Sequence, residues 1–290
     1  MTRVATDPAC RVETRPTGSP VGRHSCRHPT LGVGLLLCLL GLAATTSSAA
    51  VFGEDDRRKL TPEEPTYAVH EALGRLTCRH PETGQKLVGT AAIVDTGTAE
   101  DGHEILLTAA HVVMDPATGK PLDDCRFKIA GRFWGSDPVV DIRHGDFDGR
   151  PHTNAADWAV VLIAPRQPAQ YRLPVWDGLS MPETVTLLGY RADRRGLWVS
   201  DHCFARPPQP DEALHGERVL LSDCDANPGA SGAPLLVRVD GKWHWGGLYR
   251  GHLYDPALHA EKHPEYQAAF SGRDAMNVIV RLPLPALPRQ

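Results

Sequence analysis

Three residues in separate segments have the types needed for nucleophilic catalysis. His111 follows "LLTAA", Asp157 opens the apolar run "DWAVVLI", and Ser231 lies in "NPGASGAP". A serine hydroxyl is a weak nucleophile at neutral pH, and a neutral imidazole activates it by taking its proton. A carboxylate beside the imidazole fixes its tautomer and stabilises the imidazolium that forms. This set of residues therefore indicates acyl transfer.

Each of these residues taken alone also has a structural interpretation. The glycines around Ser231 suit any tight loop, and the chain has 14 histidines, so one after a strand is unremarkable in itself. Asp157 could be a turn residue or a helix cap. The order His, Asp, Ser and the sequences that flank the three residues favour the catalytic interpretation of the set.

The elements that must position these residues are short strands. Between turns rich in Gly, Pro, Asp and Asn, apolar runs of strand length occur at 73–79, 87–94, 104–108, 157–163, 184–190, 197–205, 217–223, 233–239 and 243–251. This pattern, with 25 prolines, is typical of an all-β barrel or sandwich. The segment "APRQPAQ" (164–170) is expected to connect two halves, and 272–282 is expected to form a short C-terminal helix.

"TAAH", "DWAVV" and "GASGAP" resemble the motifs of trypsin-like (chymotrypsin-fold) serine peptidases, over roughly 74–250. "VFGEDDR", from Val51, is similar to the mature start of bacterial glutamyl endopeptidases, which are secreted members. The resemblance implies two antiparallel β-barrels, 51–166 with an N-terminal segment and 167–290, with the active site in the cleft between them. It also implies a secreted endopeptidase that works through an acyl-enzyme, without cofactor. The N–H groups of Gly229 and Ser231 would form its oxyanion hole.

The resemblance leaves specificity open. Asp225 lies where trypsin-type members carry the acid of the primary pocket, which predicts cleavage after Arg or Lys. The equal alternative is a turn in which Asp225 binds backbone N–H groups. Tyr249 stands where glutamyl-specific members carry a histidine, although Arg250 or His252 beyond it could attract an acidic side chain.

Ala230 replaces the aspartate that accepts the new N-terminus in digestive members, so that activation ion pair cannot form. One hypothesis is that the Val51 end, freed by signal cleavage, docks elsewhere on the second barrel. The alternatives to a peptidase cleaving after Arg or Lys are a Glu-specific endopeptidase and an inactive relative that only binds. The order of the triad argues against an α/β-hydrolase esterase.

Residues 1–50 are expected to be a signal peptide with an N-terminal extension. The apolar run from Leu31 to Ala44 is too short for a span of about 20 residues. Ser48 and Ala50 suit positions minus three and minus one of a cleavage site, which gives a mature start at Val51. The expected location is secreted or periplasmic, and the alternative is an uncleaved membrane anchor.

The cysteines beyond this segment are consistent with export. An even number of them in an exported chain predicts disulfides. Four allow three pairings, and we predict one bridge in each half of the mature chain, Cys78–Cys125 and Cys203–Cys224.

The mild net charge of −4 argues against a nucleic-acid or anionic-membrane partner. We expect a monomer that acts on proteins or peptides, without a stable membrane partner unless the signal stays uncleaved. No metal is expected, because "HAEKH" (259–263) is not the order of a zinc protease. Asp141, Asp146 and Asp148 fit a solvated loop better than a cation site.

Overall fold

The computed structural model describes residues 49–96, 102–148, 155–165, 169–178, 184–192, 194–254, 265–273 and 275–283. The expected signal segment and "HAEKH" lie outside these residues, apart from the last residues before Val51. The protein is almost entirely β-structure, as predicted. No helix among the described residues has the length and apolar character needed to cross a membrane.

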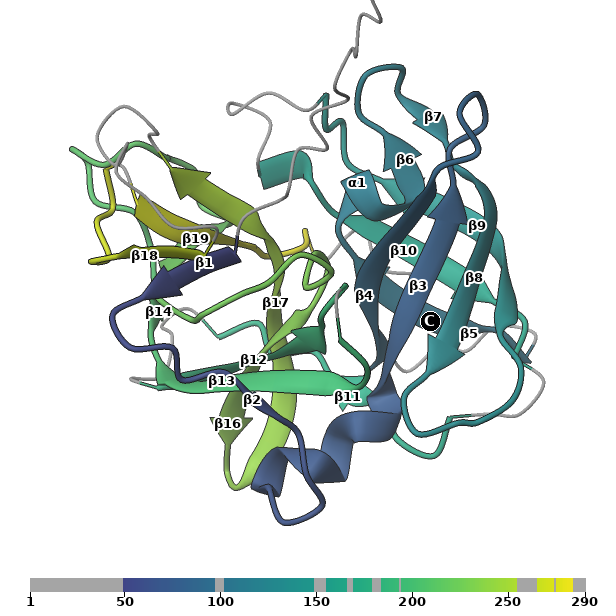
Figure 1. The fold of residues 1–290 in the computed structure, drawn as a ribbon, viewed down its shortest axis with the longest axis horizontal. Coiled ribbons are helices and arrows are strands. Elements are labelled where there is room, and N and C mark those ends of the chain that lie inside the picture. The colour runs from purple at the N-terminus through teal and green to yellow at the C-terminus, as the bar shows by residue number, and fades with distance from the viewer. Residues whose placement is uncertain are drawn as a thin grey trace, which may run out of the picture. The chain divides into compact units, whose positions relative to one another are not determined.

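The first sheet closes on itself as a six-stranded antiparallel barrel (Figure 1). Its strands run in the order β4-β3-β8-β9-β10-β5, and β5 pairs back with β4. Their bounds are β3 Leu73–Arg79, β4 Lys86–Asp95, β5 Glu104–Thr108, β8 Asp123–Ile129, β9 Asp137–His144 and β10 Ala159–Ile163. A short strand, β11 (Leu173–Pro174), pairs in parallel with the end of β4.

The second sheet has eight strands and is strongly rolled. Its order is β14-β15-β19-β17-β16-β12-β13-β2. The bounds are β2 Arg58–Lys59, β12 Val185–Tyr190, β13 Leu197–Cys203, β14 Ala205–Arg206, β15 Val219–Ser222, β16 Pro234–Val239, β17 Lys242–Tyr254 and β19 Ala275–Val280. β13 and β14 lie near opposite margins of this sheet but follow each other in the chain. The sheet therefore curls toward a second barrel, although no pairing among the described residues closes it.

Strands that lie far apart in the chain also pair with each other. β2 precedes the first barrel yet pairs with β13 in the second sheet. β1 (Ala49–Phe52) pairs in parallel with β18 (Glu265–Ala268) near the other end of the chain, and the two form a separate two-stranded sheet. The boundary near residue 166 stays a prediction.

Short helices and a hairpin occupy the ends of the first barrel. The 3-10 helix η1 (Pro65–Ala72) precedes β3, and the one-turn helix α1 (Ala110–Val113) follows β5. After α1 come the short paired strands β6 (Met114–Asp115) and β7 (Lys120–Pro121). Figure 1 shows α1 and these strands at the same end of the barrel.

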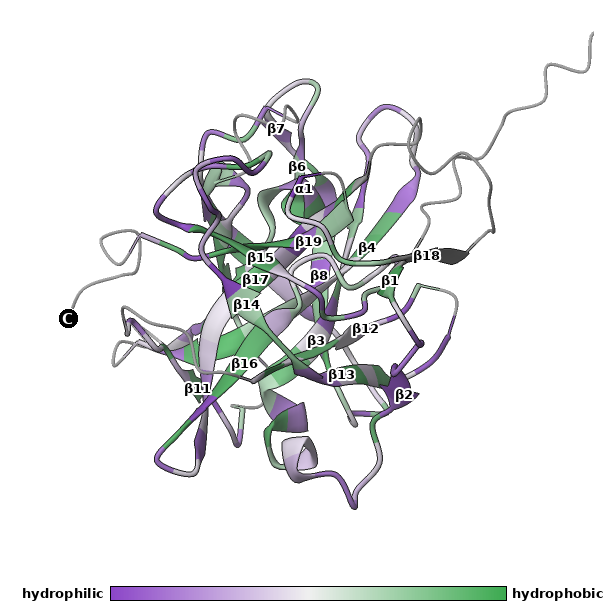
Figure 2. Cartoon of the chain, turned by 90° about the vertical axis from the view of Figure 1, so that its left-hand side faces the viewer, coloured by the Kyte–Doolittle hydropathy of each residue, from purple (hydrophilic) through white to green (hydrophobic). Residues whose placement is uncertain are grey.

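Apolar side chains from alternate positions fill the interior. Leu73, Leu106, Phe127 and Ile163 are fully buried in the first barrel. In Figure 2 the strands around β15 and β16 are mainly green, whereas the polar strand β2 at the margin is purple. As predicted, each half of the chain has a disulfide. Cys78–Cys125 joins β3 to β8 in the first sheet, and Cys203–Cys224 joins β13 to the residues after β15 in the second.

The predicted C-terminal helix is wrong. The segment forms β19, which lies between β15 and β17 with all six residues buried. A strand that is covered on both faces is continuously apolar and lacks the two-residue alternation that marks a half-exposed strand. The β-branched residues Val278, Ile279 and Val280 favour the extended conformation.

Candidate active site

His111 and Asp157 come together because β5 and β10 are paired. In their register Thr108 lies opposite Ala159, so α1 after β5 meets the residues just before β10. Asp157 is fully buried, and its Oδ2 lies 2.8 Å from His111 Nδ1. Its Oδ1 accepts the backbone N–H of His111 at 3.0 Å. The carboxylate therefore holds both the ring and the backbone of the histidine.

The loop that carries Ser231 packs against the same part of the first barrel. The Ser231 carbonyl accepts the Thr90 N–H at 2.8 Å. A Cβ added to Gly232 would lie 3.0 Å from the nitrogen of Ala109, two residues before His111. Gly232, at φ +82°, is thus needed both for its conformation and for this close approach. The structure brings the serine loop to the His111–Asp157 pair.

The Ser231 hydroxyl makes no hydrogen bond to His111 among the described residues. In structures without a substrate such bonds are often long and shorten only when the substrate binds. The His111 side chain is 27 % exposed. The imidazole is therefore reachable from solvent on the side not bonded to Asp157.

Two backbone N–H groups beside Ser231 are available to bind an anion. The Pro228 carbonyl accepts the Ala192 N–H at 2.7 Å, and the Gly229 carbonyl accepts Thr90 Oγ1 at 2.9 Å. Because a trans peptide directs its C=O and N–H oppositely, the Gly229 N–H points away from Ala192. Neither the Gly229 nor the Ser231 N–H has an acceptor among the described residues. Two donors on one tight loop can stabilise an oxyanion.

The sequence and the fold were compared with known proteins. A family profile described as a trypsin-like peptidase domain matches residues 89–243. The chain belongs to the trypsin-like peptidases. This membership makes it a serine endopeptidase by class. No curated protein was found to match the chain.

The solved structures that share the fold of this peptidase include two proteases. The protease Anisep from Arthrobacter nicotinovorans is 12 % identical, with a TM-score of 0.52, over 77 % of this chain and 92 % of that one. A Glu endopeptidase in complex with MPD is 13 % identical, with a TM-score of 0.54, over 80 % of this chain and 93 % of that one. At such identities the likeness concerns the fold alone.

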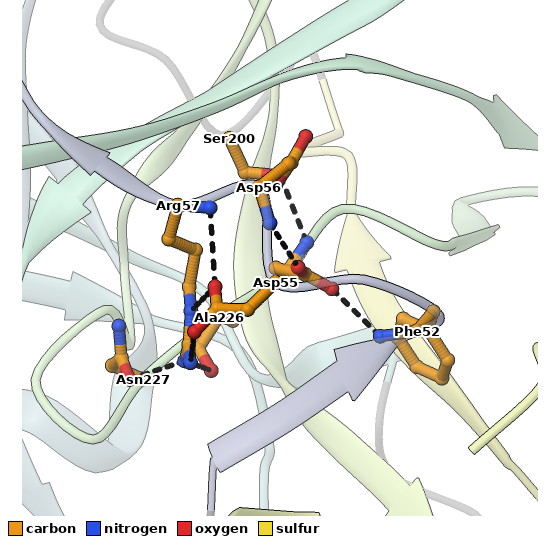
Figure 3. A network of polar contacts seen from close by, with 8 residues as sticks. Phe52, Asp55, Asp56, Arg57, Ser200, Ala226 and Asn227 are labelled. Carbon is orange, nitrogen blue, oxygen red and sulfur yellow. Dashed lines mark hydrogen bonds and ion pairs between the residues drawn. The ribbon is translucent and has the colours of Figure 1, made fainter. Parts of the chain in front are cut away.

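Asp225 is covered by the N-terminal segment of the peptidase. Its Oδ1 accepts the Phe52 N–H at 2.7 Å, and its Oδ2 accepts the Asp56 N–H at 3.2 Å (Figure 3). The residue is 5 % exposed, and burial raises the pKa of its carboxyl to about 7. Asp225 thus binds backbone N–H groups, as in the alternative interpretation, but the donors come from a distant segment and not from its own turn.

Arg57 on the same segment reaches the chain that leads to Gly229. Its Nη1 donates to the Ala226 carbonyl at 3.1 Å and to the side-chain oxygen of Asn227 (Figure 3). Asp55 balances the charge through an ion pair of 2.6 Å. We call residues 52–57 the N-terminal strap. The sequence suggested only that the Val51 end docks on the second barrel. It did not indicate residues 225–227 as the partners, because no local pattern marks contacts between residues about 170 positions apart.

Tyr249 holds the serine loop through its backbone. Its carbonyl accepts the Gly232 N–H at 2.7 Å, and its N–H donates to the Ala233 carbonyl at 2.8 Å. The side chain is buried, with its hydroxyl 3.4 Å from Asn277 Oδ1, and burial raises its pKa. The Tyr249 ring is part of the core, so a role in substrate binding would have to come from its backbone.

Arg250, the next residue, contacts the candidate triad. Its Nε lies 3.2 Å from Asp157 Oδ2, and its guanidinium lies 5.2 Å from the Phe147 ring centre. The Phe147 ring is in turn 6.3 Å from that of His111. Asp157 is thus shared between an imidazole and a guanidinium. The sequence marked Arg250 only as a cation that could attract an acidic side chain.

A metal centre has no support in the described part of the chain. No group of three or more His, Cys, Asp or Glu side chains that could hold an ion occurs there. Asp141 lies in strand β9 and not in the expected loop, where it is half exposed and 3.7 Å from Arg143.

Proposed function

We propose that this peptidase hydrolyses peptide bonds through an acyl-enzyme on Ser231. The observation that carries the proposal is the buried Asp157 carboxylate bonded to both the ring and the backbone of His111, with the serine loop packed beside them. Because Nδ1 of His111 donates to Asp157, its Nε2 is the nitrogen left to act as a base.

The reaction follows from these roles. Ser231 Oγ attacks the substrate carbonyl carbon while its proton passes to His111 Nε2. The oxyanion that forms is stabilised by the N–H groups of Gly229 and Ser231. His111 then gives the proton to the leaving amine, and a water molecule repeats the sequence to release the acid and restore the serine.

Labelling with a fluorophosphonate tests the mechanism, because this reagent reacts with an activated serine. The purified protein should be labelled, and the Ser231→Ala variant should not. Labelling of both proteins would place the nucleophile elsewhere. A folded protein that is not labelled would favour the inactive relative, for which the missing Ser231–His111 hydrogen bond among the described residues is the supporting observation.

Cleavage after Arg or Lys loses its main support, because both oxygens of Asp225 are bound to the strap. Arg250 is a cation beside the catalytic residues; it pairs with Asp157 through Nε, and its side chain is 18 % exposed. We therefore favour substrates with an acidic residue near the scissile bond. Peptides that differ only in Arg, Lys, Glu or Gln before that bond decide the question, and the highest kcat/KM for Arg or Lys would overturn this preference.

Export of the peptidase is supported by its two disulfides, since such bonds persist in oxidising compartments. Fractionation of cells that produce the tagged protein would place it in the medium or periplasm. Recovery in the membrane fraction with the 1–50 segment still attached would favour the anchored alternative.

A further inference from the structure

A concave cationic surface lies on the outside of the first barrel. Along β3 and β8 the buried residues alternate with outward residues, so Arg75 and Arg79 point out beside Arg126 and Lys128. They line a hollow of about 400 Å³, which we call the cationic hollow. Its lining is Arg75, Thr77, Arg79, Lys86, Asp124, Arg126, Lys128, Gly135 and Ser136. β3 and β8 are neighbours on the near side of the barrel in Figure 1.

The charges of this hollow are unbalanced. Its only anionic lining residue is Asp124, which lies 3.0 Å from Arg126 and 3.7 Å from Arg79. Arg75 lies directly opposite Lys128 in the β3–β8 register. Like charges in that position destabilise a sheet. An excess of positive charge here therefore opposes folding, in a chain whose net charge is −4.

Two exposed aromatic side chains lie at the edge of the cationic hollow. Phe133 is 87 % and Trp134 is 91 % exposed, on the loop between β8 and β9. The next residues of this loop, Gly135 and Ser136, line the hollow, and Lys128 Nζ donates to the Phe133 carbonyl at 3.1 Å. Large apolar side chains left in water beside cations mark surfaces that bind something.

We propose that the cationic hollow and the Phe133–Trp134 loop bind the surface of an anionic lipid bilayer. Phosphate headgroups would lie against the arginines and lysines, and the two aromatic rings would enter the interface between headgroups and acyl chains. Basic residues combined with exposed aromatic residues are the usual composition of interfacial binding surfaces.

A bilayer fits these observations better than a soluble polyanion. Neither Phe133 nor Trp134 lines the hollow itself, so a polymer that fills only the hollow leaves both rings in water. A bilayer extends beyond the hollow, so it can contact the cations and the neighbouring loop together. The net charge, which argued against such a partner, is a sum over the whole chain and does not report local clusters.

Vesicle co-sedimentation tests the proposal with the full chain carrying Ser231→Ala, which prevents self-digestion. The probes are vesicles of phosphatidylcholine alone and vesicles with about one-third phosphatidylglycerol. Neutral vesicles measure any binding by the apolar N-terminal run. We expect clear additional binding to the anionic vesicles, and its loss as the salt concentration rises.

Three double variants locate the surface. Arg75→Glu with Arg126→Glu should weaken binding to anionic vesicles at least about tenfold, since each basic residue near such a surface contributes about fivefold. Phe133→Ser with Trp134→Ser should weaken it as well. The matched control is Arg195→Glu with Lys242→Glu, at two exposed residues outside the hollow. This control should weaken binding to anionic vesicles less than the first pair does. Thermal unfolding checks folding, and Arg75→Gln with Arg126→Gln replaces the first pair if it is unstable.

The same proteins are then mixed with heparin and with a single-stranded oligonucleotide. We expect these polyanions to bind equally well with and without the Phe133 and Trp134 rings, and that result agrees with the proposal. The proposal is overturned if anionic vesicles bind no better than neutral ones, or if the first charge-reversal pair behaves like its control. It is also overturned if the polyanions bind and the vesicles do not. The test does not depend on catalysis, so the proposed function can fail separately.

Discussion

Among single residues, Arg250 is the one whose position changes the expected chemistry most. Its Nε shares the Oδ2 of Asp157 with the imidazole of His111. A buried carboxylate is costly unless it is paired, and removing one of its partners is strongly destabilising. Arg250 therefore supports Asp157 in the position from which it orients the imidazole.

Arg250→Gln should therefore lower kcat/KM, by on the order of tenfold, because Asp157 loses its cationic partner and orients the imidazole less firmly. Arg250→Lys keeps a cation beside Asp157 and should retain more of the activity. An equal loss in both variants would show that the shape of the arginine matters and not its charge.

Asp157→Asn should lower kcat by about 10⁴-fold with little change in KM, because the amide holds the imidazole in the wrong tautomer. Stopped assays on a cleavable peptide measure both constants. A loss below about tenfold would remove Asp157 from the mechanism.

The role of Asp157 could be predicted from the sequence, whereas the contact of Arg250 with Asp157 could not. Asp157 opens an apolar strand, and the residues around it could be compared with a family motif. The contact of Arg250 with Asp157 depends on the irregular pairing of β17 with β19 between Tyr249 and Gly251. No periodicity in the sequence indicates which side chain such an irregularity directs inward.

Among the elements, the N-terminal strap connects a distant segment to the candidate oxyanion hole. Arg57 is 8 % exposed and binds Ala226 and Asn227, directly before Pro228 and Gly229. Buried polar groups that lose their partner cost about 1–3 kcal/mol, and charged ones cost more. The order of the loop should therefore depend on this one side chain.

Arg57→Met keeps the length of the side chain but removes its donors. We expect fluorophosphonate labelling to slow at least about tenfold, with KM changed less than kcat, because the loop N–H groups are no longer held in place. The matched control is Arg58→Met, which removes ion pairs to Glu64 and Asp201 at a side chain 40 % exposed. It should cost up to about 1 kcal/mol of stability and leave labelling unchanged. Equal slowing in both variants would mean that the strap acts only through overall stability.

The strap also makes stability depend on pH. Burial raises the pKa of Asp225 from its ordinary value of 3.8 to about 7 in the folded protein. Between these two pH values the folded state binds the proton and the unfolded state does not. The contribution of Asp225 to the free energy of unfolding is therefore complete below about pH 4 and is lost as the pH rises to 7. Denaturant unfolding between pH 4 and 8 should show this decline, and Asp225→Asn should flatten it. A wild-type curve parallel to that of the variant would contradict the assignment.

Strands were predictable where apolar and polar residues alternate or where turn residues frame an apolar run, as in β5 and β12. Two kinds of strand were missed or mistaken. β19 is covered on both faces and was expected to be a helix. β8, "DDCRFKI", was not predicted, because its outward positions carry the charges of the cationic hollow.

At the scale of the whole molecule, the disulfides stabilise the two sheets separately. Cys78–Cys125 spans 47 residues in the first sheet, and Cys203–Cys224 spans 21 in the second. Loops of these lengths correspond to about 3–4 kcal/mol each in the chain-entropy account. Both pairings were predicted from the even number of cysteines and their division between the halves.

Serine pairs at these positions should separate stability from assembly of the site. Replacing Cys78 and Cys125 should lower the unfolding midpoint and leave labelling at 25 °C intact. Replacing Cys203 and Cys224 should also slow labelling, because Cys224 is adjacent to the strap-bound Asp225. If the first pair slowed labelling as much as the second, the two sheets would not be independent in this respect.

The net charge did not reveal the cationic hollow, since an acidic total conceals a basic face. The basic residues cluster because inward and outward side chains alternate along β3 and β8, and because the register of the two strands places the outward ones side by side. Neither property can be read from the composition of the chain.

The strap also has a consequence for the order in which the protein is made. Residues 52–57 leave the ribosome early, whereas Asp225, Ala226 and Asn227 follow some 170 residues later. At about 5–20 residues per second, roughly ten seconds or more separate the two segments during translation. During that interval Arg57 lacks its partners Ala226 and Asn227, so the strap cannot take its final position until residues 225–227 have been synthesised. The first barrel can therefore form before the segment that precedes it is fixed.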